Sequence, residues 1–347
     1  MLQINLLSPE ELALLKTLIS NAEHIAITCH KSPDGDSLGS ALAWADYLAG
    51  EGKHPSVVSP DAFPDFLQWL PNSQTVLRYD RVKEKVEQAL AEADLIFCLD
   101  INDTAREDEM QAVLDASKAH RVMIDHHLNP VMTGLDLMVS HPDLSSTSEL
   151  IFRLIWQLEG FEKMSRRCAM QLYCGMMTDT GGFTYNSTHP EIYFIISQLL
   201  SKGIDKDKIY RNVYHNYSAW AMRLRGYVMY RKLNVMDDLH ASYYGLTRDE
   251  MRRFHFIKGD AEGLVNEPLR IKGMKLSVSL REDTERDNLV WVSLRSVDNF
   301  PANEMAHDFF NGGGHLNASG GRLNCSMEEA ERVVWKAIMA YADLLKA

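Results

Sequence analysis

The chain has 347 residues, of which 46% are hydrophobic and 24% are charged. This composition is that of a globular protein and excludes a largely disordered chain, and the length leaves room for about two domains. The formal net charge of −12 excludes a protein that holds long duplex DNA by charge alone. Phosphate substrates stay open, because bound divalent cations reverse the local sign of a site.

No targeting or membrane segment is expected. The sequence contains no run of about 18 apolar residues, and residues 1–11 lack the basic and apolar regions of a secretory signal. The cysteines are odd in number and contain no C-x-x-C pair, so we expect small buried side chains rather than a disulfide framework or a zinc site. They are Cys29, Cys98, Cys168, Cys174 and Cys325. The expectation is a cytoplasmic protein with no membrane partner.

The first third of the chain alternates between helical and strand-like patterns. A capping box from Ser8 to Glu11, with Pro9 at the first helical position, predicts a helix that runs to about Ala22. Strands are expected at 24–29, 55–59, 74–78, 94–99 and 121–124, and helices at 37–49, 62–70, 82–91 and 107–118. This alternation is typical of βαβ units, so we predict a parallel sheet with helices on both faces.

The pattern changes in the second half. Residues 147–179 and 189–201 are helical, and the apolar stripe from Leu150 to Leu158 is expected in the core rather than at an interface. A long amphipathic helix is expected within 206–234. Strand-like runs follow at 239–246, 274–280 and 289–294, with helices near Val265 and at the end. We therefore predict an α/β catalytic domain at 1–209, a linker helix at 210–236 and a smaller α/β domain at 237–347.

Polar clusters directly follow three of the predicted strands. In open α/β sheets such clusters converge at the carboxyl ends of the strands, where ligands bind. The first cluster offers an imidazole and two carboxylates, His30, Asp34 and Asp36, a set suited to Mn²⁺, Mg²⁺ or Zn²⁺. Gly35 lets the turn tighten between the aspartates. The alternative is an Asx turn with a helix-capping aspartate.

The other clusters are Asp100, Asp125-His126-His127 and the segment around Asp179. Each one alone is compatible with a cap or a surface pair, but together they supply many ligands to one sheet edge. Such a set, rich in carboxylate, suits two cations bridged by a shared carboxylate. The six candidate ligands are His30, Asp34, Asp36, Asp100, His126 and Asp179.

A glycine-rich segment lies far downstream, at residues 311–321. Consecutive glycines let successive backbone N–H groups point at one anion, so the segment is a candidate phosphate nest, with a flexible loop as the alternative. Arg295 follows a predicted strand of the same domain, where its planar guanidinium can bind phosphate oxygens.

This ordered set of motifs resembles the DHH phosphoesterase superfamily. The matching positions are His30-x3-Asp34-x-Asp36, Asp100, Asp125-His126-His127 and Thr178-Asp179-Thr180, while Gly312–His315 through Gly320, preceded by Arg295-Ser296, resembles the DHHA1 domain. The resemblance covers nearly the whole chain and is greatest to the NrnA-type oligoribonuclease and pAp phosphatase branch. It implies a parallel-sheet DHH domain and a smaller DHHA1 domain that binds substrate.

The resemblance also implies roles for individual residues. One metal ion, usually manganese with magnesium as an alternative, would be held by His30, Asp34 and Asp100. A second would be held by Asp36, Asp100, His126 and Asp179, with Asp100 bridging. His127 is expected near the scissile phosphate, and Asp125 is expected to orient a ligand histidine. The residues expected to contact substrate are Arg106, Arg295, Ser296, Gly313, Gly314 and His315.

The implied activity is hydrolysis of short oligonucleotides or 3′,5′-pAp by metal-activated water. Alternatives in the same superfamily are a cyclic-dinucleotide phosphodiesterase and an exopolyphosphatase. An inorganic pyrophosphatase resembles the chain poorly after Gly182, and a RecJ-like exonuclease has further domains. A non-catalytic nucleotide sensor is the alternative from another class, disfavoured because every ligand position is intact. The sequence leaves open the oligomeric state, with a homodimer among the states considered.

Overall fold

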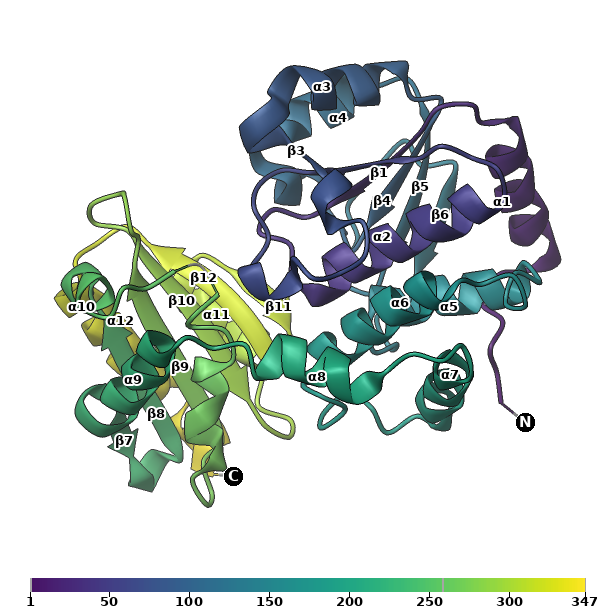
Figure 1. Cartoon of the computed structure of the whole chain (residues 1–347). Helices are drawn as coiled ribbons and strands as arrows, with labels where there is room; N and C mark the ends of the chain where they lie inside the picture. Colours follow the sequence, from purple (N-terminus) through teal and green to yellow (C-terminus); the bar gives the residue numbers. More distant parts are fainter. Residues whose placement is uncertain (1, 258, 347) are drawn as a thin grey trace. The chain divides into compact units, whose positions relative to one another are not determined.

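Two units make up the chain in the computed structural model, which describes residues 2–257 and 259–346 (Figure 1). They are Met1–Asn216 and Tyr217–Ala347, and the boundary falls inside the segment predicted to link two domains. Both units are mixed α/β structures, as predicted. Among the described residues, no helix is both long and apolar enough to cross a membrane.

The first unit is built on a six-stranded sheet in which every pair is parallel. The strand order is β3-β2-β1-β4-β5-β6. Strands β1 and β4 are buried along their whole length, which explains their nearly continuous apolar sequences. The strands are β1 (Ile25–Cys29), β2 (Ser56–Ser59), β3 (Leu77–Arg78), β4 (Leu95–Leu99), β5 (His120–Asp125) and β6 (Leu137–Ser140).

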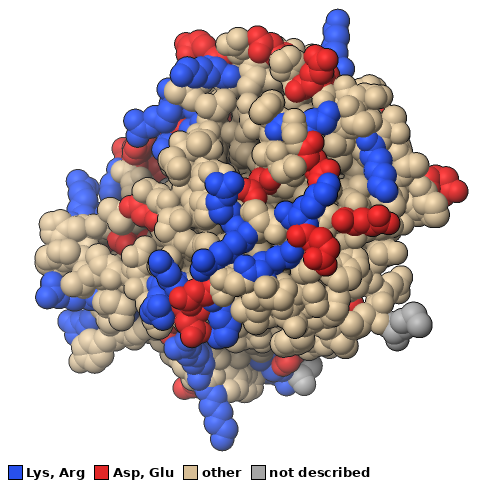
Figure 2. Space-filling model, turned by 45° about the vertical axis from the view of Figure 1, so that its right-hand side comes forward, with Lys and Arg blue, Asp and Glu red and all other residues tan. Residues whose placement is uncertain are grey.

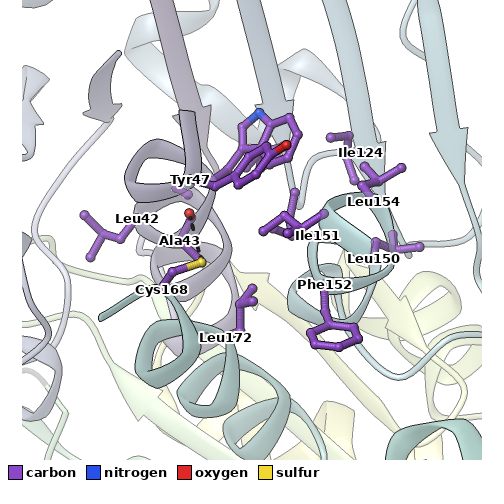
Figure 3. Close-up of a cluster of buried hydrophobic side chains, with 14 of the residues drawn as sticks. Leu42, Ala43, Tyr47, Ile124, Leu150, Ile151, Phe152, Leu154, Cys168 and Leu172 are labelled. Carbon is purple, nitrogen blue, oxygen red and sulfur yellow. Dashed lines mark hydrogen bonds between the residues drawn. The ribbon is translucent and has the colours of Figure 1, made fainter. Parts of the chain in front are cut away.

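Helices cover both faces of this sheet, as predicted. Side chains such as Ile27 and Phe97 join one buried cluster with α2, α5 and α6, whereas Ala26 and Ile96 join a second with α3 and α4. Figure 3 shows the first cluster, in which Leu150, Ile151 and Leu154 of α5 are packed as expected. The helices are α1 (Pro9–Asn21), α2 (Gly35–Gly50), α3 (Tyr79–Glu92), α4 (Gln111–Ala116), α5 (Thr147–Gln157), α6 (Arg166–Asp179), α7 (Pro190–Ser201) and α8 (Lys206–Tyr214).

Several predicted elements of the first unit are wrong in length or kind. The helix expected at 62–70 is only a 3₁₀ turn, Asp65–Leu67, in a segment flanked by Pro64 and Pro71, which lack N–H donors. The helical pattern at 147–179 is two helices, α5 and α6, and each begins at its own serine cap. The cysteines are free, and four of the five are buried.

The second unit contains a mixed sheet of order β11-β12-β10-β9-β8-β7. Only β8 and β9 pair in parallel. Helices α11 and α12 pack on one face, and α9 and α10 form a smaller cluster with β8. The elements are β7 (Asn234–Met236), β8 (Ala241–Leu246), β9 (Leu276–Glu282), β10 (Val290–Ser296), β11 (Gly313–His315), β12 (Ala318–Leu323), α9 (Ala219–Tyr227), α10 (Arg248–Arg253), α11 (Ala302–Phe310), α12 (Met327–Ala340) and α13 (Ala342–Lys346).

The continuous linker helix expected at 210–236 is not present. Helix α8 ends at Tyr214, and α9 begins at Ala219. The Ser218 hydroxyl accepts a hydrogen bond from the N–H of Ala221, so the chain restarts a helix there with a new N-cap. A π-helical turn, Val228–Lys232, then leads into β7. The predicted helical segment therefore forms two separate helices, α8 and α9, divided by the N-cap at Ser218.

Glu107, in the 3₁₀ segment Thr104–Met110 that follows β4, carries a buried carboxyl group. It is fully buried and accepts a hydrogen bond of 2.6 Å from the Thr28 hydroxyl of β1, while its second oxygen has no partner. Burial raises the pKa of Glu107 to about 8. The folded chain therefore holds a proton that the unfolded chain has lost between about pH 4.5 and pH 8, so this group lowers stability as the pH rises through that range.

Replacing Glu107 by glutamine removes this titration and keeps an acceptor for Thr28. The melting temperature of Glu107→Gln minus that of the wild type is expected to increase by several degrees when the pH is raised from 5 to 8.5. Melting curves of both proteins across this range test it. A melting-temperature difference that does not change with pH would show that Glu107 is ionised in the folded protein.

Candidate metal centre

The predicted clusters of the first unit meet at the carboxyl edge of its parallel sheet. His30 follows β1, Asp100 follows β4, and Asp125 ends β5, three adjacent strands (Figure 1). On one side of β1 lie β2 and then β3, and on the other side lie β4, β5 and β6. The site therefore lies at the point where the strand order reverses, the usual position of ligands in such sheets.

The first group of candidate ligands is His30, Asp34 and Asp100, whose ligand atoms lie within 4.8 Å of one another. His30 Nε2 is 3.3 Å from Asp100 Oδ2 and 3.9 Å from Asp34 Oδ2. Asp34 Oδ1 accepts hydrogen bonds from the N–H groups of Asp36 and Ser37 and so caps α2. One oxygen of Asp34 therefore caps the helix, as the alternative interpretation expected, and the other faces the group.

The second group is Asp36, Asp100 and His126, within the same 4.8 Å limit. His126 Nε2 lies 3.9 Å from Asp36 Oδ2, 3.6 Å from Asp100 Oδ1 and 3.3 Å from Asp179 Oδ2. All six predicted ligand side chains thus gather in one cluster, with Asp100 common to both groups. We call these six residues the acidic cluster.

Two residues that sequence reasoning missed hold the cluster in place. The N–H groups of Thr147 and Ser148, at the start of α5, donate to the two oxygens of Asp36 at 2.6 and 2.8 Å. The Thr147 hydroxyl donates to Asp100 Oδ1 at 3.0 Å. A helix N-terminus stabilises negative charge at this position. The Ser146-x-x-Glu149 pattern ahead of an apolar run was a signal for such a helix start.

Glycines let α2 and α6 approach closely, which brings Asp36 and Asp179 to one site. A Cβ atom at Gly39 would lie 2.7 Å from the carbonyl oxygen of Gln171. A Cβ atom at Gly175 would lie 2.0 Å from Ser148 Oγ and 2.9 Å from Asp36 Oδ1. A side chain at Gly39 would require a shift of the backbone of α6, and one at Gly175 would displace the side chains of Ser148 and Asp36.

The two histidines of the cluster present the same nitrogen to it. His30 Nδ1 is 2.7 Å from the carbonyl oxygen of Lys31, and His126 Nδ1 is 3.2 Å from that of Leu144. These contacts engage Nδ1 of each ring, so Nε2 is the nitrogen that faces the carboxylates and is available to a metal ion, the usual arrangement of metal-binding histidines. The donor set, imidazole nitrogens and carboxylate oxygens, fits divalent cations.

The electrostatics of the acidic cluster indicate a site built for positive charge. Burial and the charge of Asp100 raise the pKa of Asp36 to about 7, and burial raises that of Asp179 well above its usual range. Burial acts to lower the pKa of His126, but the carboxylates of Asp179, Asp100 and Asp36 outweigh it and raise the pKa to about 9. Buried carboxylates that repel one another are stabilised by a bound cation.

Beside the cluster, Asp125 holds His127. The fully buried Asp125 carboxylate contacts His127 Nδ1 at 2.7 Å and accepts from its backbone N–H at 2.9 Å. The sequence predicted that Asp125 orients a ligand histidine, and the histidine that its carboxylate contacts is His127. Arg106 Nη1 lies 3.1 Å from the His127 ring nitrogens and donates to the Asp100 carbonyl at 3.2 Å.

Substitution of Asp125 by asparagine tests this contact. Asp125→Asn keeps the shape of the side chain but removes the charge that fixes the ring and proton of His127. We expect kcat to fall by about 10- to 100-fold with little change in KM. Steady-state kinetics from pH 6 to 9 measure the loss and any displacement of the pH profile. An unchanged kcat would show that His127 needs no such partner.

The expected substrate residues of the second unit lie on or beside its sheet. Arg295 and Ser296 end β10, and Gly313–His315 forms β11. The hydroxyl of Ser296 is buried, donates to the carbonyl of Phe300 and accepts from Asn317 Nδ2, so its hydrogen bonds stay within the unit.

The glycine-rich segment is not the open nest that the sequence suggested, because it pairs with β12 as an antiparallel hairpin. A Cβ atom at Gly312 would lie 1.9 Å from the carbonyl oxygen of Gly320, and one at Gly321 would lie 2.3 Å from that of Phe310. These glycines serve close packing of backbones. Gly313 and Gly314 remain exposed.

Comparison with known proteins identifies relatives of this chain. Residues 24–176 match the DHH family, N-terminal domain. The chain belongs to the DHH family. Its fold is that of an exopolyphosphatase-related protein from Bacteroides fragilis, with 49% identity, 98% of both chains covered and a TM-score of 0.93.

Two curated members of the DHH family match more distantly. The bifunctional oligoribonuclease and PAP phosphatase NrnA of Bacillus subtilis is 26% identical over 91% of this chain and 94% of its own. The cyclic-di-AMP phosphodiesterase PdeA of Listeria monocytogenes is 24% identical over 94% of this chain and 49% of its own. The chain is thus a phosphoesterase of this family, a class of hydrolase.

Proposed function

We propose that the protein is a manganese-dependent phosphoesterase that hydrolyses short oligonucleotides and 3′,5′-pAp. The observation that carries this is the acidic cluster, in which two ligand groups share Asp100. NrnA of Bacillus subtilis, similar over nearly its whole length, is named for both activities. The proposed catalytic and metal-binding residues of the first unit are the acidic cluster with His127, Asp125 and Arg106. The proposed substrate contacts of the second unit are Arg295, Ser296, Gly313, Gly314 and His315.

Two divalent cations are proposed to be held by His30, Asp34 and Asp100 and by Asp36, Asp100, His126 and Asp179. When bound, they neutralise phosphate charge and make water acidic enough to ionise near neutral pH. Mn²⁺ is the expected ion, with Mg²⁺ as the alternative, as the resemblance to the DHH superfamily implies; the donor set of carboxylates and imidazoles fits divalent cations of this kind.

The residues beside the cluster complete the chemistry. Because Asp125 binds His127 Nδ1, the opposite nitrogen, Nε2, is the one that can give a proton to a leaving alkoxide. The Arg106 guanidinium, next to that ring, can neutralise charge that develops on phosphate oxygens. Asp100 adopts a left-handed backbone conformation, with φ of 61°, which is uncommon outside glycine and is concentrated at functional sites.

The charge of the protein favours a substrate with few phosphates. Lys and Arg side chains are interspersed with Asp and Glu on the molecular face in Figure 2. A long polynucleotide is bound through many basic contacts, which a net charge of −12 opposes. A dinucleotide or a nucleoside bisphosphate needs only a few.

The test is release of mononucleotide or phosphate with Mn²⁺ from a panel of substrates: 3′,5′-pAp, a dinucleotide, an RNA 5-mer, an RNA 24-mer, cyclic di-AMP, pyrophosphate and polyphosphate. Fast turnover of pAp and the dinucleotide, and slow turnover of the 24-mer, is the expected result. A variant at an exposed carboxylate of α8, Asp207→Asn, serves as a control that should keep full activity.

Other outcomes would reassign the substrate. Cleavage of polyphosphate alone would favour the activity suggested by the name of the Bacteroides fragilis relative. Preference for cyclic di-AMP would favour that of PdeA. Binding of nucleotides without turnover of any substrate would favour a sensor.

A further inference from the structure

Two strands of the second unit carry the same four residues in a row. Val278-Ser279-Leu280-Arg281 lies in β9, and Val292-Ser293-Leu294-Arg295 lies in β10. The strands are antiparallel, with Ser279 directly opposite Ser293. The two copies are therefore related by a local two-fold rotation about this serine pair. Each arginine follows its serine by two positions, so both arginines share the face of the sheet that the serines occupy.

The opposite face of the two strands is core. The valines and leucines of both copies belong to the cluster that α11 and α12 cover. Neighbouring strands extend the serine and arginine face on both sides, with Tyr244 of β8 opposite Ser279 and Gly320 of β12 opposite Ser293. We call Tyr244, Ser279, Arg281, Ser293 and Arg295 the arginine face.

Neither guanidinium group of this face forms an ion pair with a described carboxylate, although the charge of Asp283 acts on Arg281. Arg281 is partly buried and makes no hydrogen bond or ion pair with any described residue; its guanidinium carbon lies 5.7 Å from the ring centre of Phe256. Arg295 is also partly buried, and its Nη1 donates to its neighbour, the carbonyl of Leu294, at 2.9 Å. Partly buried cations without acidic partners are costly unless an anion compensates them.

Buried polar atoms without partners gather at the same place. Four of the five such side-chain atoms among the described residues of the second unit are Arg225 Nε, Tyr244 OH, Ser277 Oγ and Arg295 Nε. Tyr244 is 1% exposed. Burial raises the pKa of Tyr244 to about 12, although neighbouring Ser279 and the charges of Arg225, Arg295 and Arg281 act to lower it. The register of β8, β9 and β10 places Tyr244, Ser277 and Arg295 on the same face of the sheet.

We propose that the arginine face is an anion site that binds a phosphate group of a nucleotide, with Arg281 and Arg295 holding its oxygens from either side of the Ser279–Ser293 pair. Planar guanidinium groups bind phosphate through paired hydrogen bonds, and the serine hydroxyls supply further donors. That the anion belongs to a nucleotide rests on the proposed function. Arg295 was expected to contact substrate; Arg281 is the new residue.

The test is calorimetric titration of the metal-free, full-length protein with adenosine 3′,5′-bisphosphate, 5′-AMP and adenosine. The phosphorylated ligands are expected to bind at least ten-fold more tightly than adenosine. Arg281→Met, which keeps a long unbranched side chain but removes the charge, should weaken bisphosphate binding at least ten-fold and leave adenosine unaffected. Arg281→Lys should be intermediate, because it keeps the charge and loses the planar fork.

A matched control is Arg332→Met on α12, which packs on the other face and whose arginine pairs with Glu328 and Glu329. It should bind the bisphosphate like the wild type. Bisphosphate affinity of Arg281→Met within two-fold of the wild type, at an unchanged melting temperature, would overturn the proposal. If Arg281→Met does not fold, Arg281→Lys decides, and wild-type affinity in that variant counts against the site.

The same proteins separate this proposal from the proposed function. A wild type that binds the bisphosphate through Arg281 but cleaves no nucleotide with Mn²⁺ would contradict the function and support the anion site. Rapid cleavage of nucleotides together with bisphosphate binding that does not depend on Arg281 would support the function and contradict the anion site.

Discussion

Asp100→Asn is expected to lower kcat/KM by at least about 10³-fold, a loss of about 4 kcal/mol in transition-state stabilisation. Asp100 belongs to both ligand groups of the acidic cluster, and its two oxygens face His30 and His126 respectively. Asparagine replaces one of these oxygens by an amide and removes the charge, so neither group stays complete. Substitution of a carboxylate that serves only one group should cost less, and Asp34→Asn is the comparison.

Asparagine is the suitable replacement because it tolerates the left-handed backbone at position 100, whereas alanine would add strain. It can also still accept the hydrogen bond from the Thr147 hydroxyl. Steady-state kinetics with the best substrate of the panel, alongside circular dichroism, separate lost chemistry from lost folding. Activity within ten-fold of the wild type in a folded Asp100→Asn protein would show that the reaction does not use this cluster.

Bound Mn²⁺ is expected to stabilise the first unit, and to do so more at high pH than at low pH. In the metal-free protein the pKa of Asp36 is raised to about 7 from an ordinary 3.8, and that of His126 is raised to about 9 from 6.5. Between the ordinary and the raised values the folded state holds protons that the unfolded chain has lost. These two groups therefore contribute less stability as the pH rises from about 4 to 9.

Cation binding displaces those protons, so the affinity for Mn²⁺ rises over the same pH range. At a free metal concentration 100 times the Kd, binding adds about 2.7 kcal/mol, or roughly 5–10 °C for a unit of this size. Melting curves with Mn²⁺ and with a chelator give the increase in melting temperature caused by the metal, once at pH 6 and once at pH 8.5. The difference at pH 8.5 should be the larger, and in Asp100→Asn it should largely disappear. A difference that shrinks with rising pH would contradict the proposed ligands.

Much of the first unit was accessible from its sequence because the signals there are local. Apolar runs such as Leu95–Leu99 predict buried strands, and the polar residue directly after each run lands at the carboxyl edge of the sheet. Thus Asp100 and His126 could be placed at that edge before the fold was known. The link between Asp36 and the amides of α5 could not, since residues 36 and 148 meet only through tertiary packing.

The second unit was less predictable for the same reason. Glycines at 312 and 321 look like a flexible anion-binding loop when only the sequence is considered, whereas backbone packing against Phe310 makes the segment a strand pair. The linker helix failed because a single serine cap, Ser218, interrupts an otherwise continuous amphipathic pattern. Arg281 carried no signal by itself, and its importance comes from the register that sets Ser279 opposite Ser293.

The close approach of α2 and α6 at Gly39 and Gly175 bears on which ions the protein can discriminate. Two backbones in direct contact leave no flexible side chains to yield, and both oxygens of Asp36 are fixed by amides. A coordination shell of this kind cannot expand freely. Ca²⁺, which needs oxygens at about 2.3–2.6 Å and six to eight of them, is therefore at a disadvantage against ions of the size of Mg²⁺, which bind at about 2.0–2.1 Å. If the acidic cluster holds divalent cations as proposed, we expect the packing of α2 against α6, one layer behind the ligands, to contribute to ion selectivity.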